Sequence, residues 1–298
     1  MNYFISTFFP AITVTSLLGL CVGCVTGHSV EADNPTGPVS PWSLEEVWTA
    51  QGPFHSPESV IYDADRKVFY VSNVNGYEEN GIGYISALSP SGEIIEEKWL
   101  EGLNAPTGTA VQGDTLYAVD FSRLAEINIP TKTIRTFYEA PEGNKSGLND
   151  ITIAPNGDVF VSASWLSAIY KLEDGKLVEW IKDDELKWAN GLYVDDEYLY
   201  VAAFYLRRIN LQTKEVERIG DDSVLEDLEA IEPDGEGGYF ITLIGEKPIM
   251  YLSPEGDIIE VLSRDTYSAD IDYASSINML VAPSGEDTVV GFSVRKHH

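Results

Sequence analysis

The chain has 298 residues, of which 44% are hydrophobic and 22% charged, a composition that excludes an intrinsically disordered protein. It carries 48 acidic and 19 basic residues, which gives a formal net charge of −29 at pH 7. This charge disfavours nucleic acids and anionic membranes as partners, because both require local positive charge, and it favours cations.

The first 24 residues are expected to be an export signal, because Met1–Cys24 contains no charged residue and is largely apolar in its second half. Cys21-Val22-Gly23-Cys24 resembles a bacterial lipobox, in which Cys24 becomes the lipidated first residue of the mature protein. A lipobox usually has Leu where Cys21 stands, and no basic residue precedes the apolar run, so simple secretion and an uncleaved anchor stay open. The sequence predicts a periplasmic or cell-envelope lipoprotein, otherwise a secreted protein, with membrane contact only through this N-terminal lipid or anchor.

A linker is predicted at residues 25–43, because Gly27–Trp42 holds three prolines and shows no hydrophobic period. Both cysteines of the chain precede this linker, so the folded domain is expected to have neither a disulfide nor thiol chemistry. The folded domain is predicted at residues 44–296.

This domain is built from an internal repeat. Each copy has a polar residue, a β-branched run, a turn of Asp, Asn or Gly, and an aromatic-aliphatic strand, as in PESVIYDADRKVFYVSN from Pro57 and LNDITIAPNGDVFVSAS from Leu148. Successive copies lie 37–49 residues apart, which is the size of a four-stranded propeller blade. The second residues of the six copies are Glu58, Thr107, Asn149, Asn190, Asp227 and Asp270.

The predicted fold is therefore all-β, a six-bladed β-propeller with four-stranded blades. Five copies are followed by two further strand patterns each, but the chain ends before the last copy completes its fourth strand. Leu44–Ala50 (LEEVWTA) is predicted to supply that strand and close the ring, since closure leaves no unpaired sheet edge.

The six repeated polar residues are predicted to meet at the mouth of the central channel, because the first strand of each blade lines that channel. Carboxylate and amide oxygens gathered without His or Cys are ligands that Ca²⁺ prefers. The sequence therefore predicts a site for Ca²⁺ or another divalent cation. The alternative is that these residues only solvate a water-filled channel or cap the starts of strands.

Residues from about Ser43 to Val294 resemble the senescence-marker-protein/gluconolactonase family of six-bladed propellers. The matching motifs open four of the inner strands, and they are Pro57-Glu58-Ser59, Asn149-Asp150, Ala189-Asn190-Gly191-Leu192 and Glu226-Asp227-Leu228. The resemblance implies a divalent metal, usually calcium, held by Glu58, Asn190 and Asp227, with Asn149 beside the metal or reaching it through water. It also implies that Asp227 acts as the general base in lactone hydrolysis.

The chain departs from the family pattern at Gly147, where the sugar-lactone hydrolases carry an arginine that contacts the substrate. Polyhydroxylated sugar acids are therefore poor candidates for the substrate. We expect the substrate to contact Asn149, Thr107, Asp270, Trp165 and Phe204, because these residues fall at strand starts or ends on the same face.

Two functions follow from these patterns. The first is an exported, calcium-dependent hydrolase of a lactone or another ester, in which a carboxylate base acts on a metal-activated water. The alternative is a non-catalytic, calcium-stabilised propeller that binds a ligand or partner on its top face, since propellers serve many functions. In both cases a small molecule is the expected partner.

Overall fold

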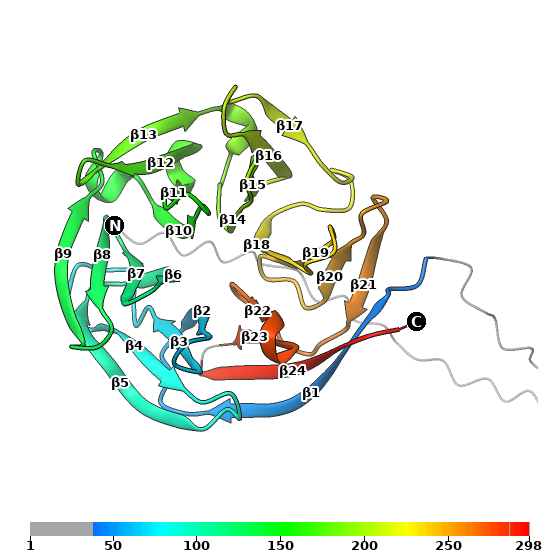
Figure 1. Cartoon of the computed structure of the whole chain (residues 1–298), viewed down its shortest axis with the longest axis horizontal. Helices are drawn as coiled ribbons and strands as arrows, with labels where there is room; N and C mark the ends of the chain where they lie inside the picture. The colour runs from blue at the N-terminus through cyan, green and yellow to red at the C-terminus, as the bar shows by residue number, and fades with distance from the viewer. Residues whose placement is uncertain (1–37, 286, 298) are drawn as a thin grey trace, which may run out of the picture. The chain divides into compact units, whose positions relative to one another are not determined.

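The computed structural model describes residues 38–285 and 287–297. They form six four-stranded sheets arranged around a centre (Figure 1), which confirms the predicted all-β, six-bladed propeller. The predicted signal segment, with Cys24, and the linker as far as residue 37 lie outside the described residues. Within residues 38–285 and 287–297, no helix has the length and apolar character needed to span a bilayer.

The first three blades follow the chain outward from the centre, each strand pairing antiparallel with the next. Blade 1 consists of β2 (Pro57–Asp63), β3 (Val68–Asn73), β4 (Gly83–Leu88) and β5 (Ile94–Leu103). Blade 2 consists of β6 (Pro106–Gln112), β7 (Thr115–Asp120), β8 (Arg123–Asn128) and β9 (Thr133–Glu139). Blade 3 consists of β10 (Leu148–Ile153), β11 (Val159–Ala163), β12 (Ala168–Glu173) and β13 (Lys176–Lys182).

The remaining blades repeat this arrangement. Blade 4 consists of β14 (Leu192–Val194), β15 (Tyr198–Ala202), β16 (Leu206–Asn210) and β17 (Val216–Arg218). Blade 5 consists of β18 (Leu228–Pro233), β19 (Tyr239–Leu243), β20 (Ile249–Leu252) and β21 (Ile258–Leu262). Blade 6 consists of β22 (Asp272–Ala274), β23 (Met279–Ser284), β24 (Thr288–Lys296) and β1 (Trp42–Gln51). Four short 3₁₀ turns join strands in the described chain: η1 (Gly143–Lys145), η2 (Ser164–Leu166), η3 (Asp184–Leu186) and η4 (Ser275–Ile277).

The N-terminal strand closes the ring as predicted. β1 pairs antiparallel with β24, with Leu44 opposite Val294 and Ala50 opposite Val289. The strand begins at Trp42 rather than at Leu44. The Trp42 indole Nε1 donates a hydrogen bond of 3.2 Å to Asp234 in blade 5, and this contact extends the closing strand toward the neighbouring blade.

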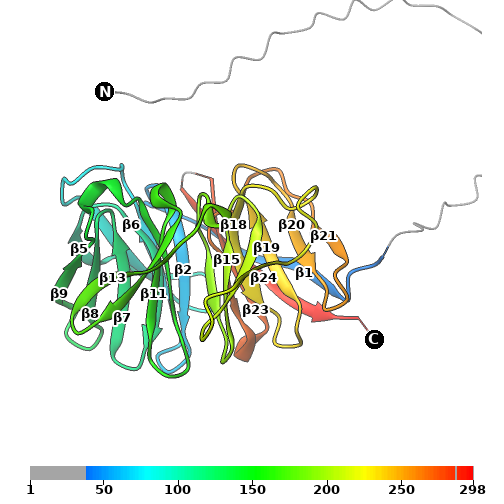
Figure 2. The ribbon, with the colours of Figure 1, turned by 90° about the horizontal axis from the view of Figure 1, so that it is seen from above.

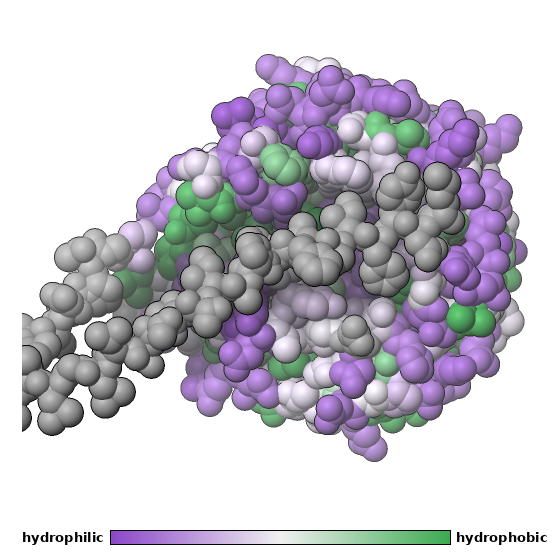
Figure 3. Space-filling model, turned by 180° about the vertical axis from the view of Figure 1, so that it is seen from behind, coloured by the Kyte–Doolittle hydropathy of each residue, from purple (hydrophilic) through white to green (hydrophobic). Residues whose placement is uncertain are grey.

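The second strands of the blades form the core. Their sequences are rich in β-branched and aromatic residues, and they are almost wholly buried because neighbouring blades cover both faces of each sheet. In one such interface Phe240 packs against Tyr273 of the next blade, with ring centroids 5.4 Å apart. Hydrophilic residues instead dominate the rim of the face drawn in Figure 3, in keeping with the acidic composition.

The inner strands are tied to one another around the channel. The Asp270 amide donates to the Glu58 carbonyl and the Gly191 amide donates to the Glu229 carbonyl, each over 2.9 Å. Viewed from the side, the strands run steeply between the two faces of the ring (Figure 2). The starts of the inner strands therefore lie together at one end of the channel, where the sequence placed the polar residues.

Candidate functional site

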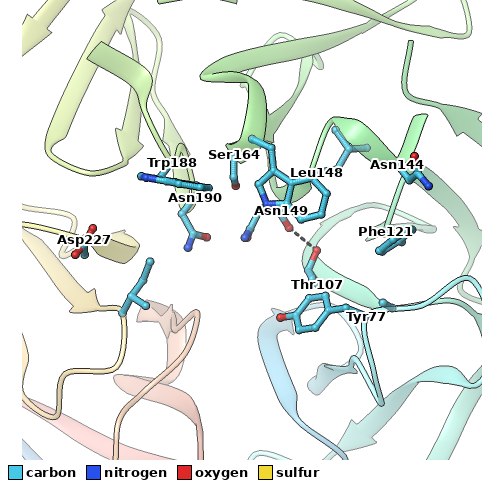
Figure 4. Close-up of a pocket in the computed structure, with 14 residues that line it drawn as sticks. Tyr77, Thr107, Phe121, Asn144, Leu148, Asn149, Ser164, Trp188, Asn190 and Asp227 are labelled. Carbon is cyan, nitrogen blue, oxygen red and sulfur yellow. Dashed lines mark hydrogen bonds between the residues drawn. The ribbon is translucent and has the colours of Figure 1, made fainter. Parts of the chain in front are cut away.

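A cavity of about 360 Å³ opens where inner strands of neighbouring blades begin. Five of the predicted site residues line it, each from a different loop or strand: Thr107, Asn149, Trp165, Asn190 and Asp227. Figure 4 shows the side chains of Asn149 and Asn190 next to each other, with Asp227 on one side of them and Thr107 on the other. Repeat-equivalent residues of blades 2 to 5 thus share one cavity.

The two asparagines are held so that an amide oxygen is left free. Asn190 donates a 3.1 Å hydrogen bond from Nδ2 to Glu229, so its Oδ1 remains available to a ligand. The backbone carbonyl of Asn149 accepts a 2.6 Å hydrogen bond from the Thr107 hydroxyl, which fixes the strand start and leaves the Asn149 side chain unbonded in the described chain. Thr107 therefore acts on the site through the backbone of Asn149.

Asp227 is fixed by its backbone rather than by its carboxylate. Its amide donates to the Phe204 carbonyl over 3.0 Å, and its carbonyl accepts from the Ile244 amide over 2.7 Å. Its φ of +51° is a left-handed conformation, which Asp and Asn adopt more readily than other non-glycine residues. The exposed carboxylate makes no hydrogen bond or ion pair with the described residues, so it is free to accept a proton or a cation.

Glu58 lies in an adjoining cavity of about 420 Å³, which shares Tyr77 and Ile244 with the first. The residue is only 8% exposed, and its Oε2 has no hydrogen-bond partner among the described residues. Burial raises the pKa of Glu58 well above its ordinary value, and the charges of Glu229 and Asp150 raise it further. A buried carboxylate oxygen without a partner is costly, and a bound cation would remove that cost.

More carboxylates line the channel than the repeat pattern singled out. Burial raises the pKa of Asp150 to about 7 even though the Asp150 carboxylate accepts a 2.6 Å hydrogen bond from the Leu192 amide. Burial also raises the pKa of Glu229 to about 7, against the hydrogen bond from Asn190, which lowers it. Glu229 and Asp272 are two residues beyond Asp227 and Asp270, and this strand period of two was the signal that could have identified them.

Two of the predicted substrate contacts lie elsewhere. Asp270 lines a separate channel cavity of about 190 Å³ together with Asp150 and Glu232. The Phe204 ring packs against Tyr205, with centroids 4.7 Å apart, and under the Lys187 ammonium. Phe204 does not line the 360 Å³ cavity and reaches the site only through its carbonyl, which holds Asp227. The aromatic character of Phe204 alone does not tell whether its side chain lines the cavity or packs beside it.

The donor set fits a hard divalent cation only if amides contribute. In the part of the chain that the structure describes, no three His, Cys, Asp or Glu side chains are close enough to hold a metal ion. The partnerless oxygen of Glu58, the free amide oxygen of Asn190 and the unbonded carboxylate of Asp227 provide oxygen donors of the kind that Ca²⁺ takes. In the kind of donor they offer, the residues match an oxygen-coordinated cation, with Glu58 in the adjoining cavity and Asn190 and Asp227 in the first.

Comparisons with solved structures find proteins of similar fold at low sequence identity. The chain is similar to the structure of a gluconolactonase from Xanthomonas campestris, with 11% sequence identity, a TM-score of 0.68, and 89% of this chain and 99% of that chain covered. A putative gluconolactonase gives 16% identity and a TM-score of 0.62 over 88% of this chain and 96% of that one. A catalytically inactive virginiamycin B lyase from Staphylococcus aureus, solved with quinupristin, gives 14% identity and a TM-score of 0.58 over 85% and 99%.

No protein-family model and no curated protein sequence matches the chain. At these identities the likeness shows the fold alone, which is similar to the folds of a gluconolactonase and of virginiamycin B lyase. The predicted resemblance to gluconolactonases is confirmed at the level of the fold.

Proposed function

We propose that the protein is an exported hydrolase of a lactone or another ester that depends on Ca²⁺ or another divalent cation. The observation that carries the proposal is the buried, partnerless Oε2 of Glu58 beside a cavity lined by Asn149, Asn190 and Asp227. Such an oxygen is stabilised when a cation occupies the site. The similarity in fold to gluconolactonases is in keeping with this reading.

Glu58, Asn190 and Asp227 would hold the cation, with Asn149 beside it. Bound there, the cation would supply Lewis-acid polarisation of the substrate carbonyl. The hydrogen bond from Asn190 to Glu229 orients the amide oxygen toward the cavity. Glu229 is thus a positioning residue for a ligand, because it holds the amide nitrogen on the far side.

Asp227 is the proposed general base. Its carboxylate takes a proton from water as the water oxygen forms a bond to the carbonyl carbon. The ester C–O bond then breaks, and the proton passes from Asp227 to the leaving alkoxide. The products are a carboxylic acid and an alcohol, or a single hydroxy acid from a lactone. Backbone hydrogen bonds at both sides of Asp227 keep its carboxylate in place without occupying it.

Hydrolysis is favoured over a lyase reaction by the residues of the cavity. The inactive virginiamycin B lyase carries alanine in place of a histidine. In this chain no histidine is among the described residues lining the cavity, and His55 packs edge-on against Tyr84 with ring centroids 6.3 Å apart. An elimination that needs a histidine base therefore lacks that base here.

The test is a panel of uncharged lactones and aryl esters, assayed with the purified protein in excess calcium and after chelation. The proposal predicts hydrolysis of at least one member, lost on chelation and restored by calcium. A protein that hydrolyses none of them but gains thermal stability from calcium would instead favour the non-catalytic binding propeller. Hydrolysis that is indifferent to chelation would contradict the metal site.

A further inference from the structure

The 360 Å³ cavity has an apolar wall that the proposed chemistry does not use. Four of the ten large hydrophobic side chains that are exposed in the described chain line this one cavity: Tyr77, Trp165, Trp188 and Ile244. Trp165 is 58% and Trp188 47% exposed. Apolar side chains gathered in one exposed concave patch mark a binding site, whereas isolated ones do not.

The wall is held in place by the backbone. Trp188 and Phe121, which also line the cavity, have φ angles of +58° and +64°. Bulky residues rarely adopt this left-handed conformation, and such strain concentrates at ligand sites. The Ser164 hydroxyl donates a 2.6 Å hydrogen bond to the Ala189 carbonyl, so the turn that carries Trp165 is tied to the segment that carries Trp188.

Gly147 gives Trp165 its place. A Cβ atom added at Gly147 would lie 2.4 Å from Cγ of the Trp165 indole, so the indole occupies the space of any side chain at this position. The φ of +57° at Gly147 also favours glycine. The position of the Trp165 indole in the cavity wall therefore depends on the absence of a side chain at Gly147.

No described side chain that lines the cavity offers positive charge to a substrate. Of the described residues that line it, none is Lys, Arg or His, and Asp227 is the single charged residue. The formal net charge of −29 adds a repulsive field toward anions. The two carboxylates proposed to hold the cation, Glu58 and Asp227, would balance its charge, so a substrate with a carboxylate or phosphate of its own would find no basic side chain to offset this field.

We infer that the site selects an uncharged ester or lactone whose non-reacting part is aromatic or otherwise apolar and contacts Trp165 and Trp188. This inference names the substrate class of the proposed function and rests on it for the reacting bond alone. The apolar contact itself is a binding property, so it is measurable without turnover.

The experiment is isothermal titration calorimetry of the calcium-loaded protein with lactams, which resist hydrolysis. The probes are 3,4-dihydro-2-quinolinone, the aromatic lactam, δ-valerolactam, which lacks the aromatic ring, and the 4-carboxylate of the quinolinone. We expect the aromatic lactam to bind about 10-fold or more tightly than each of the other two, the gain expected from burying one ring. Equal affinities, or tightest binding of the carboxylate, would overturn the inference.

Matched variants locate the contact. Trp165→Ala and Trp188→Ala are each expected to weaken the aromatic lactam about 10-fold, with δ-valerolactam little changed. Ile95→Ala removes a hydrophobic side chain that is 56% exposed outside this cavity and is expected to leave both affinities unchanged. Trp165→Phe keeps a ring and should restore most of the lost affinity, which separates ring contact from damage to the fold. Loss of affinity in Ile95→Ala, or none in either tryptophan variant, would contradict the assignment.

Failure of the two proposals gives different results. Aromatic preference in lactam binding without hydrolysis of any ester would overturn the hydrolase and leave this inference standing. Hydrolysis of esters without any preference for an aromatic group would do the reverse.

Discussion

The mouth of the channel and its interior have opposite chemistry within one ring of strands. At the mouth, Trp165, Trp188 and Ile244 face an open cavity. In the interior, burial raises the pKa of Asp270, and the charges of Asp150, Glu58 and Glu232 raise it further. Because the blades repeat, equivalent positions converge, and each inner strand contributes to both regions. The apolar wall of the mouth suits recognition of a neutral group beside the proposed cation ligands, and the carboxylates of the interior add negative potential beneath them.

The largest effect that would separate the regions is expected from Asp227→Asn at the mouth. An amide oxygen still ligates a cation, and water screens the charge lost at the exposed Asp227, unlike at the buried Glu58. An amide does not accept a proton from water at neutral pH. We expect kcat for a lactone to fall about 100-fold or more, with the calcium-dependent melting temperature nearly unchanged. Turnover in saturating calcium, compared with wild type, is the measurement.

The matched control is Glu226→Gln, which removes an exposed carboxylate next to Asp227 in the chain. It is expected to retain wild-type turnover. If Asp227→Asn kept full turnover, Asp227 would be removed from the mechanism, and Glu229 or Asp270 would be the next candidate base.

The acidic interior predicts that the metal-free protein loses stability as pH rises. Burial raises the pKa of Asp272 to about 7, against the hydrogen bond from the Tyr62 amide, which lowers it. Burial also raises the pKa of Glu232, and the charge of Asp272 adds to it. A carboxyl group whose pKa is higher in the folded state binds more protons there, so stability is greatest below the unfolded pKa of about 4 and falls as pH rises toward 7.

We expect the free energy of unfolding in chelator to fall by about 1–3 kcal/mol between pH 5 and pH 8, as measured by urea denaturation. Asp272→Asn keeps an oxygen acceptor for the Tyr62 amide and should flatten part of this slope. A stability that rises over this range, or an unchanged slope in the variant, would show that ionisation of these buried carboxyl groups does not destabilise the folded protein.

A smaller effect is expected at the wall of the mouth. Gly147→Ala puts a methyl group where the Trp165 indole lies and forces alanine into a left-handed conformation. We expect a loss of about 1–2 kcal/mol in unfolding free energy and weaker binding of the aromatic lactam. Gly143→Ala is the matched control, because Gly143 also has a positive φ of +56° but open space around its Cβ position. Equal binding losses in both variants would mean that the clash with Trp165 is unimportant.

The sequence predicted the fold of the propeller better than the residues that line its cavity and channel. The repeat predicted the number of blades and the pairing of Leu44–Ala50 with the last blade, and the structure confirms both. Both predictions follow from the apolar pattern, because it marks each strand and shows that the last blade lacks one. The shared cavity of Thr107, Asn149, Asn190 and Asp227 also followed from repeat-equivalent positions.

The wall of the cavity was harder to predict. Phe204 and Trp165 are both aromatic residues at strand ends, yet only Trp165 lines the cavity, since the direction of a side chain in a loop depends on local backbone angles. The depth of the acidic channel was also missed. Asp150 and Glu232 lie at inner-strand positions other than the repeated one, so the repeat comparison did not select them.

The central claim is that the mouth holds a divalent cation through Glu58, and calcium calorimetry tests it most directly. The account predicts that about one calcium ion binds per wild-type chain, and that Glu58→Gln weakens binding about 10-fold or more, because the amide has no charge to offer the cation. Excess calcium should then partly restore turnover in that variant. No calcium binding by the wild type, or wild-type affinity in Glu58→Gln, would contradict the account.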